Sequence, residues 1–143
     1  MSKLFLALAS TLAMVVVLCP RRTRGQVIPP PPNRAARVQI TKGPNLESVQ
    51  GTQAIIRWTS NNPGGTAEHY AFVQYGTDPN HLTQTAKNHI RLNRTHSHTV
   101  FRVRLENLKP ETTYYYVVDS MEADGTRDGA KSPVCHFISP ANP

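Results

Sequence analysis

The feature that most constrains the fold is a pair of alternating runs between residues 98 and 120, joined by a short polar corner. Every second residue from 101 to 105 is apolar, and the same holds from 114 to 118. Alternation with period two in β-branched and aromatic residues is typical of half-buried β-strands. Pro110 fixes its own φ and lacks an amide donor, which favours a turn between the runs. The stretch predicts two strands around a tight corner, with Leu108 plugging the end of the core.

Shorter runs of the same kind occur along the rest of the chain, separated by residues that favour turns. We expect strands at residues 37–40, 54–59, 70–75 and 134–138, and a short edge strand around 89–91. Gly43 and Pro44 are expected to end the first of these strands. Trp58 is expected in the core; an exposed ligand platform is the alternative. Seven short strands with turns between them predict an all-β, antiparallel sandwich.

The corner at residues 108–118 resembles the E–F corner of fibronectin type III domains, in which a tyrosine hydroxyl bonds back to the backbone. Tyr114 takes the place of that tyrosine, and its bond would reach the backbone near residues 108–110. Together with Val73-Gln74-Tyr75-Gly76-Thr77, the corner looks like the N-terminal sandwich domain of purple acid phosphatases over roughly residues 36–139. The resemblance implies a seven-stranded immunoglobulin-like (fibronectin type III) sandwich. In that family the metal ligands belong to the catalytic domain that follows, so it implies no catalytic residue here.

The chain begins with features of a secretory signal peptide. Lys3 is followed by an almost unbroken apolar run at residues 4–19, which is shorter than the ~20 residues of a membrane span. An uncleaved anchor and lipidation at Cys19 are the alternatives. We therefore expect a signal peptide at 1–25, a proline-rich linker at 26–35, the sandwich at 36–139 and a tail at 140–143. This organisation predicts a secreted, periplasmic or cell-surface protein with no membrane span in the mature chain.

The net charge of +7 comes largely from this first segment. Residues 1–25 hold four basic and no acidic residues, which leaves 12 basic against nine acidic residues in the remainder. Aromatic residues suited to stacking bases are sparse, so no nucleic-acid partner is predicted. The body of about 100 residues suits one domain with one modest core.

Residues that could support catalysis or bind a metal do not form a convincing set. His96 and His98 share one strand face, but a stable zinc site needs three or four ligands. The acidic residues between 119 and 128 depart from the spacing of a calcium loop, so a solvated hairpin is the favoured interpretation. Cys135 would be the single cysteine of the mature chain, and a buried thiol is favoured over a reactive one. We predict no enzyme activity, no metal and no cofactor.

The most informative functional feature is a basic stretch from Lys87 to Arg104, which holds five basic residues, three histidines and no acidic residue. Arg102 and Arg104 must project outward if the apolar residues between and beside them project inward. The candidate binding residues are Arg91, Arg94, Arg102 and Arg104. They would form a contact surface for a protein or for an anionic cell-envelope or extracellular polymer.

The sequence therefore favours an exported, non-catalytic binding or spacer module. A solvated strand face, with the arginines balanced by nearby carboxylates, is the alternative interpretation of the basic stretch. The alternative function is that of an accessory N-terminal domain of a purple acid phosphatase-like metallophosphatase, whose catalytic half is missing or lies on another chain.

Overall fold

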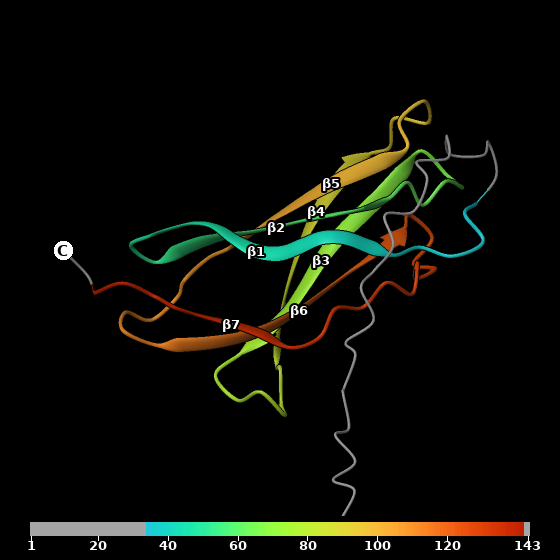
Figure 1. Cartoon of the computed structure of the whole chain (residues 1–143). Coiled ribbons are helices and arrows are strands. Elements are labelled where there is room, and N and C mark those ends of the chain that lie inside the picture. Colours follow the sequence, from blue (N-terminus) through green and yellow to red (C-terminus); the bar gives the residue numbers. More distant parts are fainter. Residues whose placement is uncertain (1–33, 142–143) are drawn as a thin grey trace, which may run out of the picture.

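The computed structural model describes residues 34–141, which form seven strands in two antiparallel sheets (Figure 1). The strands are β1 (Ile40–Gln50), β2 (Gln53–Asn61), β3 (Glu68–Gly76), β4 (Gln84–Arg91), β5 (His98–Leu105), β6 (Thr113–Glu122) and β7 (Cys135–Ile138). One sheet has the order β1-β2-β5 and the other β4-β3-β6-β7. The predicted antiparallel, all-β sandwich is confirmed. The predicted signal peptide and nearly all of the predicted linker lie outside the described residues.

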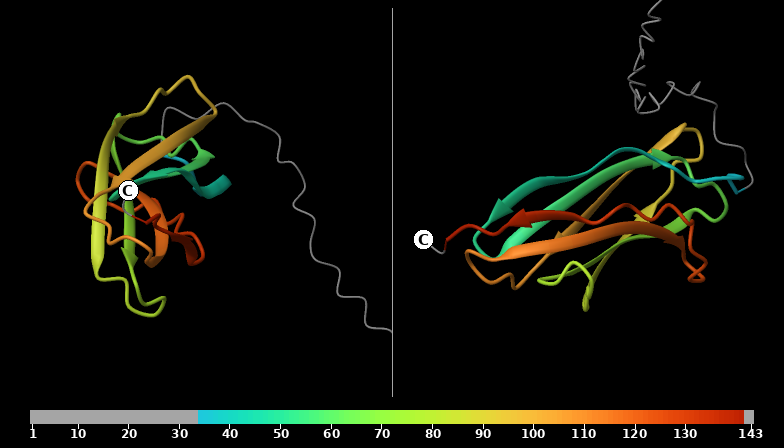
Figure 2. Two further views of the ribbon diagram at one scale, coloured as in Figure 1. Left: turned by 90° about the vertical axis from the view of Figure 1, so that its left-hand side faces the viewer. Right: turned by 60° about the horizontal axis from the view of Figure 1, so that its bottom comes forward.

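The two sheets pack face to face along the length of an elongated body (Figure 2). Their core-facing residues alternate along β2, β3 and β5, as the period-two pattern predicted. The ring of Trp58 is 2% exposed and stacks on Phe101 with 5.1 Å between ring centroids, so its predicted place in the core is confirmed. The core also contains Ile56, Val73, Val103, Leu105, Tyr116, Val118 and Phe137.

The corner between β5 and β6 connects the two sheets. Leu108 is 2% exposed and closes one end of the core, as predicted. The hydroxyl of Tyr114 accepts a hydrogen bond from the amide of Lys109 at 2.9 Å, which confirms the predicted bond back to the corner. Glu111 has a φ of +49°, a left-handed conformation that is uncommon for a residue with a side chain.

β1 differs from the prediction. It begins at Ile40, not at Arg37, and continues through Gly43 and Pro44 to Gln50. The pairing with β2 shifts register between Lys42 and Asn45. Gly43 and Pro44 therefore form an irregularity within the strand and do not end it. This is tolerated because β1 is an edge strand, where a proline without an amide donor need not break a central ladder.

The segment between β6 and β7 also departs from a simple hairpin. A tight turn follows β6, where the Gly125 amide donates to the Glu122 carbonyl at 2.9 Å. The chain then runs back along β6 without forming a strand, and Arg127 lies over the Phe72 ring at 4.1 Å. The amides of Asp128 and Ser132 donate to the carbonyls of Ser120 and Val118, so this segment lies along the edge of β6. Residues on both faces of β6, such as Val117 and Val118, are buried.

Candidate binding groove

A groove lies where β4 of one sheet passes β5 of the other. The side-chain amide of Asn88 donates to the carbonyl oxygen of Arg102 at 2.9 Å and links the two strands across this edge. The groove has a volume of about 670 Å³. Its lining residues are Ile55, Tyr75, Thr85, Ala86, Lys87, Asn88, Arg102, Arg104, Glu106 and Asn107. We call this the β4–β5 groove.

Three basic side chains lie in this lining, on two strands that belong to different sheets. Lys87 comes from β4, and Arg102 and Arg104 come from β5. The two arginines are exposed, whereas Phe101, Val103 and Leu105 are fully buried, so the predicted inward and outward faces of β5 are confirmed. The β4–β5 groove is therefore a concave surface with an excess of positive charge, since Glu106 is the one acidic residue of its lining.

Arg102 is partly neutralised by an acidic residue of β1. Its Nε lies 2.8 Å and 3.0 Å from the two carboxylate oxygens of Glu47. Arg57, which is paired with Arg102 across β2 and β5, also approaches Glu47 at 3.7 Å. The hydrogen bond from Arg102 lowers the pKa of Glu47, and the same bond raises the pKa of Arg102. Glu47 therefore stays ionised and offsets part of the positive charge.

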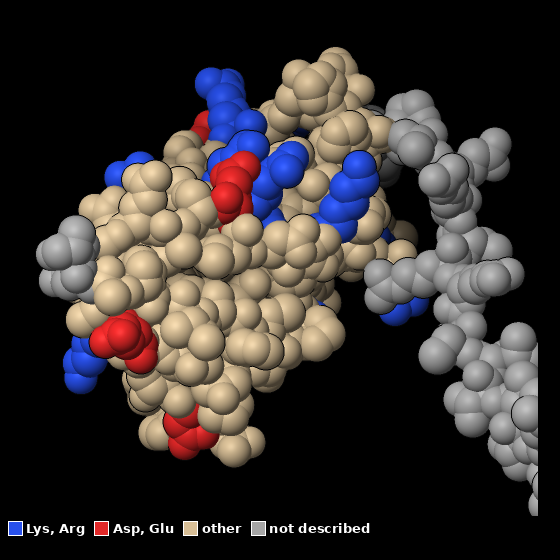
Figure 3. Space-filling model, turned by 60° about the vertical axis from the view of Figure 1, so that its left-hand side comes forward, with Lys and Arg blue, Asp and Glu red and all other residues tan. Residues whose placement is uncertain are grey.

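The four predicted binding arginines are not all brought together. Arg102 and Arg104 share the groove, and within residues 34–141 Arg104 has no acidic side chain within ion-pair distance. Arg91 lines a smaller hollow of about 250 Å³ beside the β4–β5 loop and pairs with Glu68 at 3.7 Å. Arg94 instead donates to the Gly65 carbonyl at 3.1 Å. In Figure 3 basic side chains gather on one face with acidic side chains among them.

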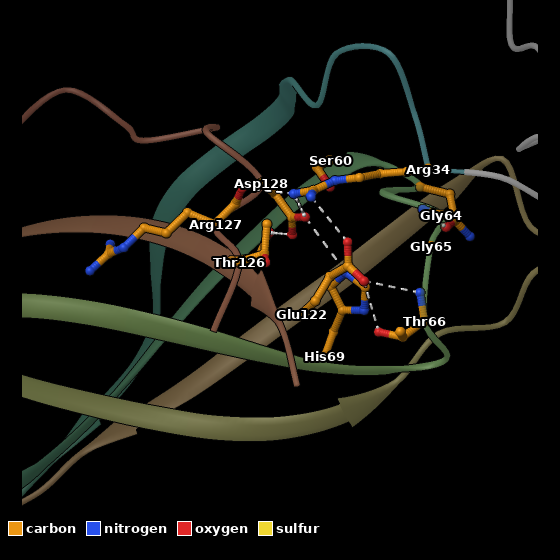
Figure 4. Close-up of polar contacts among 12 residues, drawn as sticks. Arg34, Ser60, Gly64, Gly65, Thr66, His69, Glu122, Thr126, Arg127 and Asp128 are labelled. Carbon is orange, nitrogen blue, oxygen red and sulfur yellow. Dashed lines mark hydrogen bonds and ion pairs between the residues drawn. The ribbon is translucent and has the colours of Figure 1, made fainter. Parts of the chain in front are cut away.

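A second polar cluster, which the sequence pattern did not predict, lies at the end of the sandwich where β3 begins and β6 ends (Figure 4). The side chains of Glu122 and Asp128 are 10% and 0% exposed, and both form ion pairs with Arg34. The fully buried His69 lies beside them. The interpretation of the acidic loop as a solvated hairpin is therefore wrong for Asp119, Glu122 and Asp128, because the chain folds these carboxylates inward.

The histidines do not assemble a metal site in the described part of the chain. The rings of His96 and His98 lie 6.5 Å apart between centroids, and within residues 34–141 no three His, Cys, Asp or Glu side chains converge on a point that could hold a metal ion. The thiol of Cys135 is partly buried, which raises its pKa. Nor does any part of residues 34–141 form a helix of the length and apolarity that a membrane crossing needs.

The fold and its corner define an accessory sandwich domain of a known family. The family model of the purple acid phosphatase N-terminal domain matches residues 41–139. The chain belongs to this family, and the suspected resemblance is confirmed. The matched domain is the one that lies N-terminal in purple acid phosphatases, distinct from a catalytic domain.

Solved structures with a similar fold include the sensor domain of the anti-sigma factor RsgI4 from Pseudobacteroides cellulosolvens. A long form is 17% identical, with 73% of this chain and 89% of that chain covered and a TM-score of 0.47. A solution structure is 16% identical, with 73% and 75% covered and a TM-score of 0.48. No curated protein sequence matches the chain.

Proposed function

We propose that the chain is an exported, non-catalytic β-sandwich module that contacts an anionic partner through the β4–β5 groove. The observation that carries this proposal is the convergence of Lys87, Arg102 and Arg104 from two sheets on one concave surface. In a groove several positive charges can contact the same ligand molecule and their fields add. Charges scattered over a convex surface contact a ligand one at a time. The partner class is a protein with an acidic surface, or an anionic cell-envelope or extracellular polymer.

Membership of a family of N-terminal domains supports the non-catalytic part of the proposal, because the matched region is not a catalytic domain. Partial neutralisation of Arg102 by Glu47 favours a weak, salt-sensitive contact over a tight one, since exposed ion pairs contribute at most about 1 kcal/mol each.

The test uses residues 26–143, the chain without its predicted signal peptide. Its retention on immobilised dextran sulfate and its capture from envelope and secreted fractions are measured at low and high salt. Arg102→Ala/Arg104→Ala should reduce retention at low salt. The matched control is Arg37→Ala/Lys131→Ala, which removes the same charge from exposed residues outside the groove lining. Equal losses in the two double variants would mean that net charge, not the groove, explains the binding.

A second candidate function is that of an accessory domain that works beside a metallophosphatase catalytic domain. The match of residues 41–139 to a purple acid phosphatase N-terminal domain favours it. Phosphatase activity that copurifies with residues 26–143 and survives high salt would support this candidate. Retention on dextran sulfate without copurifying phosphatase activity would favour the first proposal.

A further inference from the structure

Two buried carboxylates at the end of the sandwich are held in place by neighbouring donors (Figure 4). One oxygen of Glu122, Oε2, accepts hydrogen bonds from the amide and the hydroxyl of Thr66 at 3.2 Å and 3.1 Å. One oxygen of Asp128, Oδ2, accepts a hydrogen bond from the hydroxyl of Ser120 at 2.5 Å. These bonds fix the orientation of both carboxylates and leave Glu122 Oε1 and Asp128 Oδ1 to a further partner.

That partner is Arg34, the first residue that the structure describes. Its Nη1 lies 3.2 Å from Glu122 Oε1, and its Nη2 lies 3.4 Å from Asp128 Oδ1. The same Nη2 donates to the carbonyl oxygen of Arg127 at 2.7 Å. Three acceptors thus surround a planar group with several fixed donors, which is the arrangement that suits a guanidinium better than the single point charge of an ammonium.

The surrounding backbone leaves space for this arrangement. Gly65 has a φ of +73°, and a Cβ at this position would lie 3.0 Å from each carboxylate oxygen of Glu122. A residue with a side chain would therefore displace the carboxylate that contacts Arg34.

His69 gives an independent indication that the cluster is built around charge. It pairs with Glu122 across β3 and β6, is fully buried, and has no hydrogen-bond partner on either ring nitrogen within residues 34–141. Its Nε2 lies 3.6 Å from Asp128 Oδ1, the oxygen that Arg34 contacts. A buried polar ring without hydrogen bonds is costly unless a nearby charge compensates, and the carboxylate of Asp128 is in position to do so.

We propose that Glu122, Asp128 and the Arg127 carbonyl form a guanidinium-binding pocket, which the chain fills with its own Arg34. The bound guanidinium anchors the segment that enters the sandwich, and a guanidinium supplied from solution can take its place. The Arg34 side chain is 37% exposed, so it can leave the pocket without unfolding a strand, whereas the carboxylates are held by Thr66 and Ser120. The pocket residues are separate from the β4–β5 groove, so this proposal does not depend on the proposed function.

The experiment empties the pocket with Arg34→Ala in residues 26–143 and titrates the variant with methylguanidinium at millimolar concentration. The amide signal of Thr66, which donates to Glu122, is followed by NMR, together with the urea midpoint of unfolding. We expect a saturable shift of this signal and partial recovery of the midpoint. Methylammonium at the same concentration should bind at least tenfold more weakly.

Two further variants decide whether the pocket is responsible for the response to methylguanidinium. Arg34→Ala/Glu122→Gln should lose the methylguanidinium response, and Arg37→Ala, which changes a neighbouring exposed arginine, should behave like the wild type. If Arg34→Ala does not fold, Arg34→Lys, which keeps the charge without the planar fork, takes its place in the titration. A response that is absent, equal for both cations or unchanged by Glu122→Gln would overturn the proposal.

Discussion

Tyr114 shows how one hydroxyl secures the connection between the two sheets. It lies at the start of β6, and its oxygen accepts from the Lys109 amide in the corner that follows β5. We expect Tyr114→Phe to lower the free energy of unfolding by about 1–2 kcal/mol, because a partly buried amide loses its partner. Urea unfolding measures this change. Tyr115→Phe is the control, since that hydroxyl makes no hydrogen bond within the described residues; an equal loss in both variants would contradict the role of the corner.

Asp119 is a buried carboxylate. Burial raises its pKa by more than its hydrogen bonds and the nearby Arg127 lower it. Its side chain is 5% exposed and lies 3.5 Å from Arg127. An acid with a raised pKa in the folded state binds its proton more tightly when folded. Its cost to stability is therefore absent at low pH and develops as pH rises through the folded pKa.

We therefore expect Asp119→Asn to gain stability relative to the wild type as pH rises from about 4 towards 7. The measurement is the difference in free energy of unfolding between the two proteins across this range. A difference that stays constant with pH would mean that Asp119 does not change its protonation between folded and unfolded states.

At the scale of the strands, β1 depends on a glycine that the sequence pattern suggested would end it. Gly43 has a φ of +82°, and a Cβ there would lie 2.9 Å from the carbonyl oxygen of Arg57 in β2. We expect Gly43→Ala to cost about 1–3 kcal/mol, because a left-handed conformation and a backbone clash add together. Gly51→Ala is the matched control for urea unfolding. Its φ is +52° but a side chain would meet nothing within 4 Å, so it should cost less.

The strands that the sequence predicted best are those whose alternation reflects a single buried face. The run at 98–105 has this property, and its inward residues were predicted correctly. The run at 113–118 alternates only as far as Tyr116, because Val117 is also buried, but its core face and the Tyr114 bond were predicted correctly. The prediction failed at Gly43 and Pro44 because local turn propensity takes no account of a register shift on an edge strand. It also placed the acidic loop in solvent, because no local pattern shows that Glu122 and Asp128 pair with the distant Arg34.

The two charged sites differ in how far sequence could predict them. Arg102 and Arg104 are two residues apart on one strand, so their shared face follows from the strand period. The guanidinium-binding pocket joins Arg34 to Asp128, which are 94 residues apart. No local pattern links these positions, although the buried His69 within an alternating run was a signal that an apolar face contained a polar residue.

At the scale of the whole molecule, the distribution of charge separates the two sites. The carboxylates at the end of the sandwich are buried and paired with Arg34, so they add little to the field outside the protein. The β4–β5 groove is open, and its positive charge is limited by Glu47. This residue lies on β1, in the same sheet as β5. Glu47 therefore reduces the net positive charge beside the groove.

This difference predicts an order among single variants of the groove. Arg104 has no acidic partner within ion-pair distance among the described residues, whereas Arg102 shares Glu47 with Arg57. We expect Arg104→Ala to weaken binding to dextran sulfate more than Arg102→Ala does. Glu47→Gln should strengthen binding by up to about fivefold, since an exposed ion pair is worth at most about 1 kcal/mol.

The measurement is the dissociation constant for dextran sulfate at several salt concentrations, since attraction between exposed charges weakens as the Debye length falls. Glu106→Gln is the control for Glu47→Gln, because Glu106 lines the groove itself but forms no ion pair with Arg102. Its removal should strengthen binding without changing the rank of the two arginines. In the Glu47→Gln background the two alanine variants should become equivalent. If Arg102→Ala is the more damaging change while Glu47 is present, the ion pair positions Arg102 for binding and does not neutralise it.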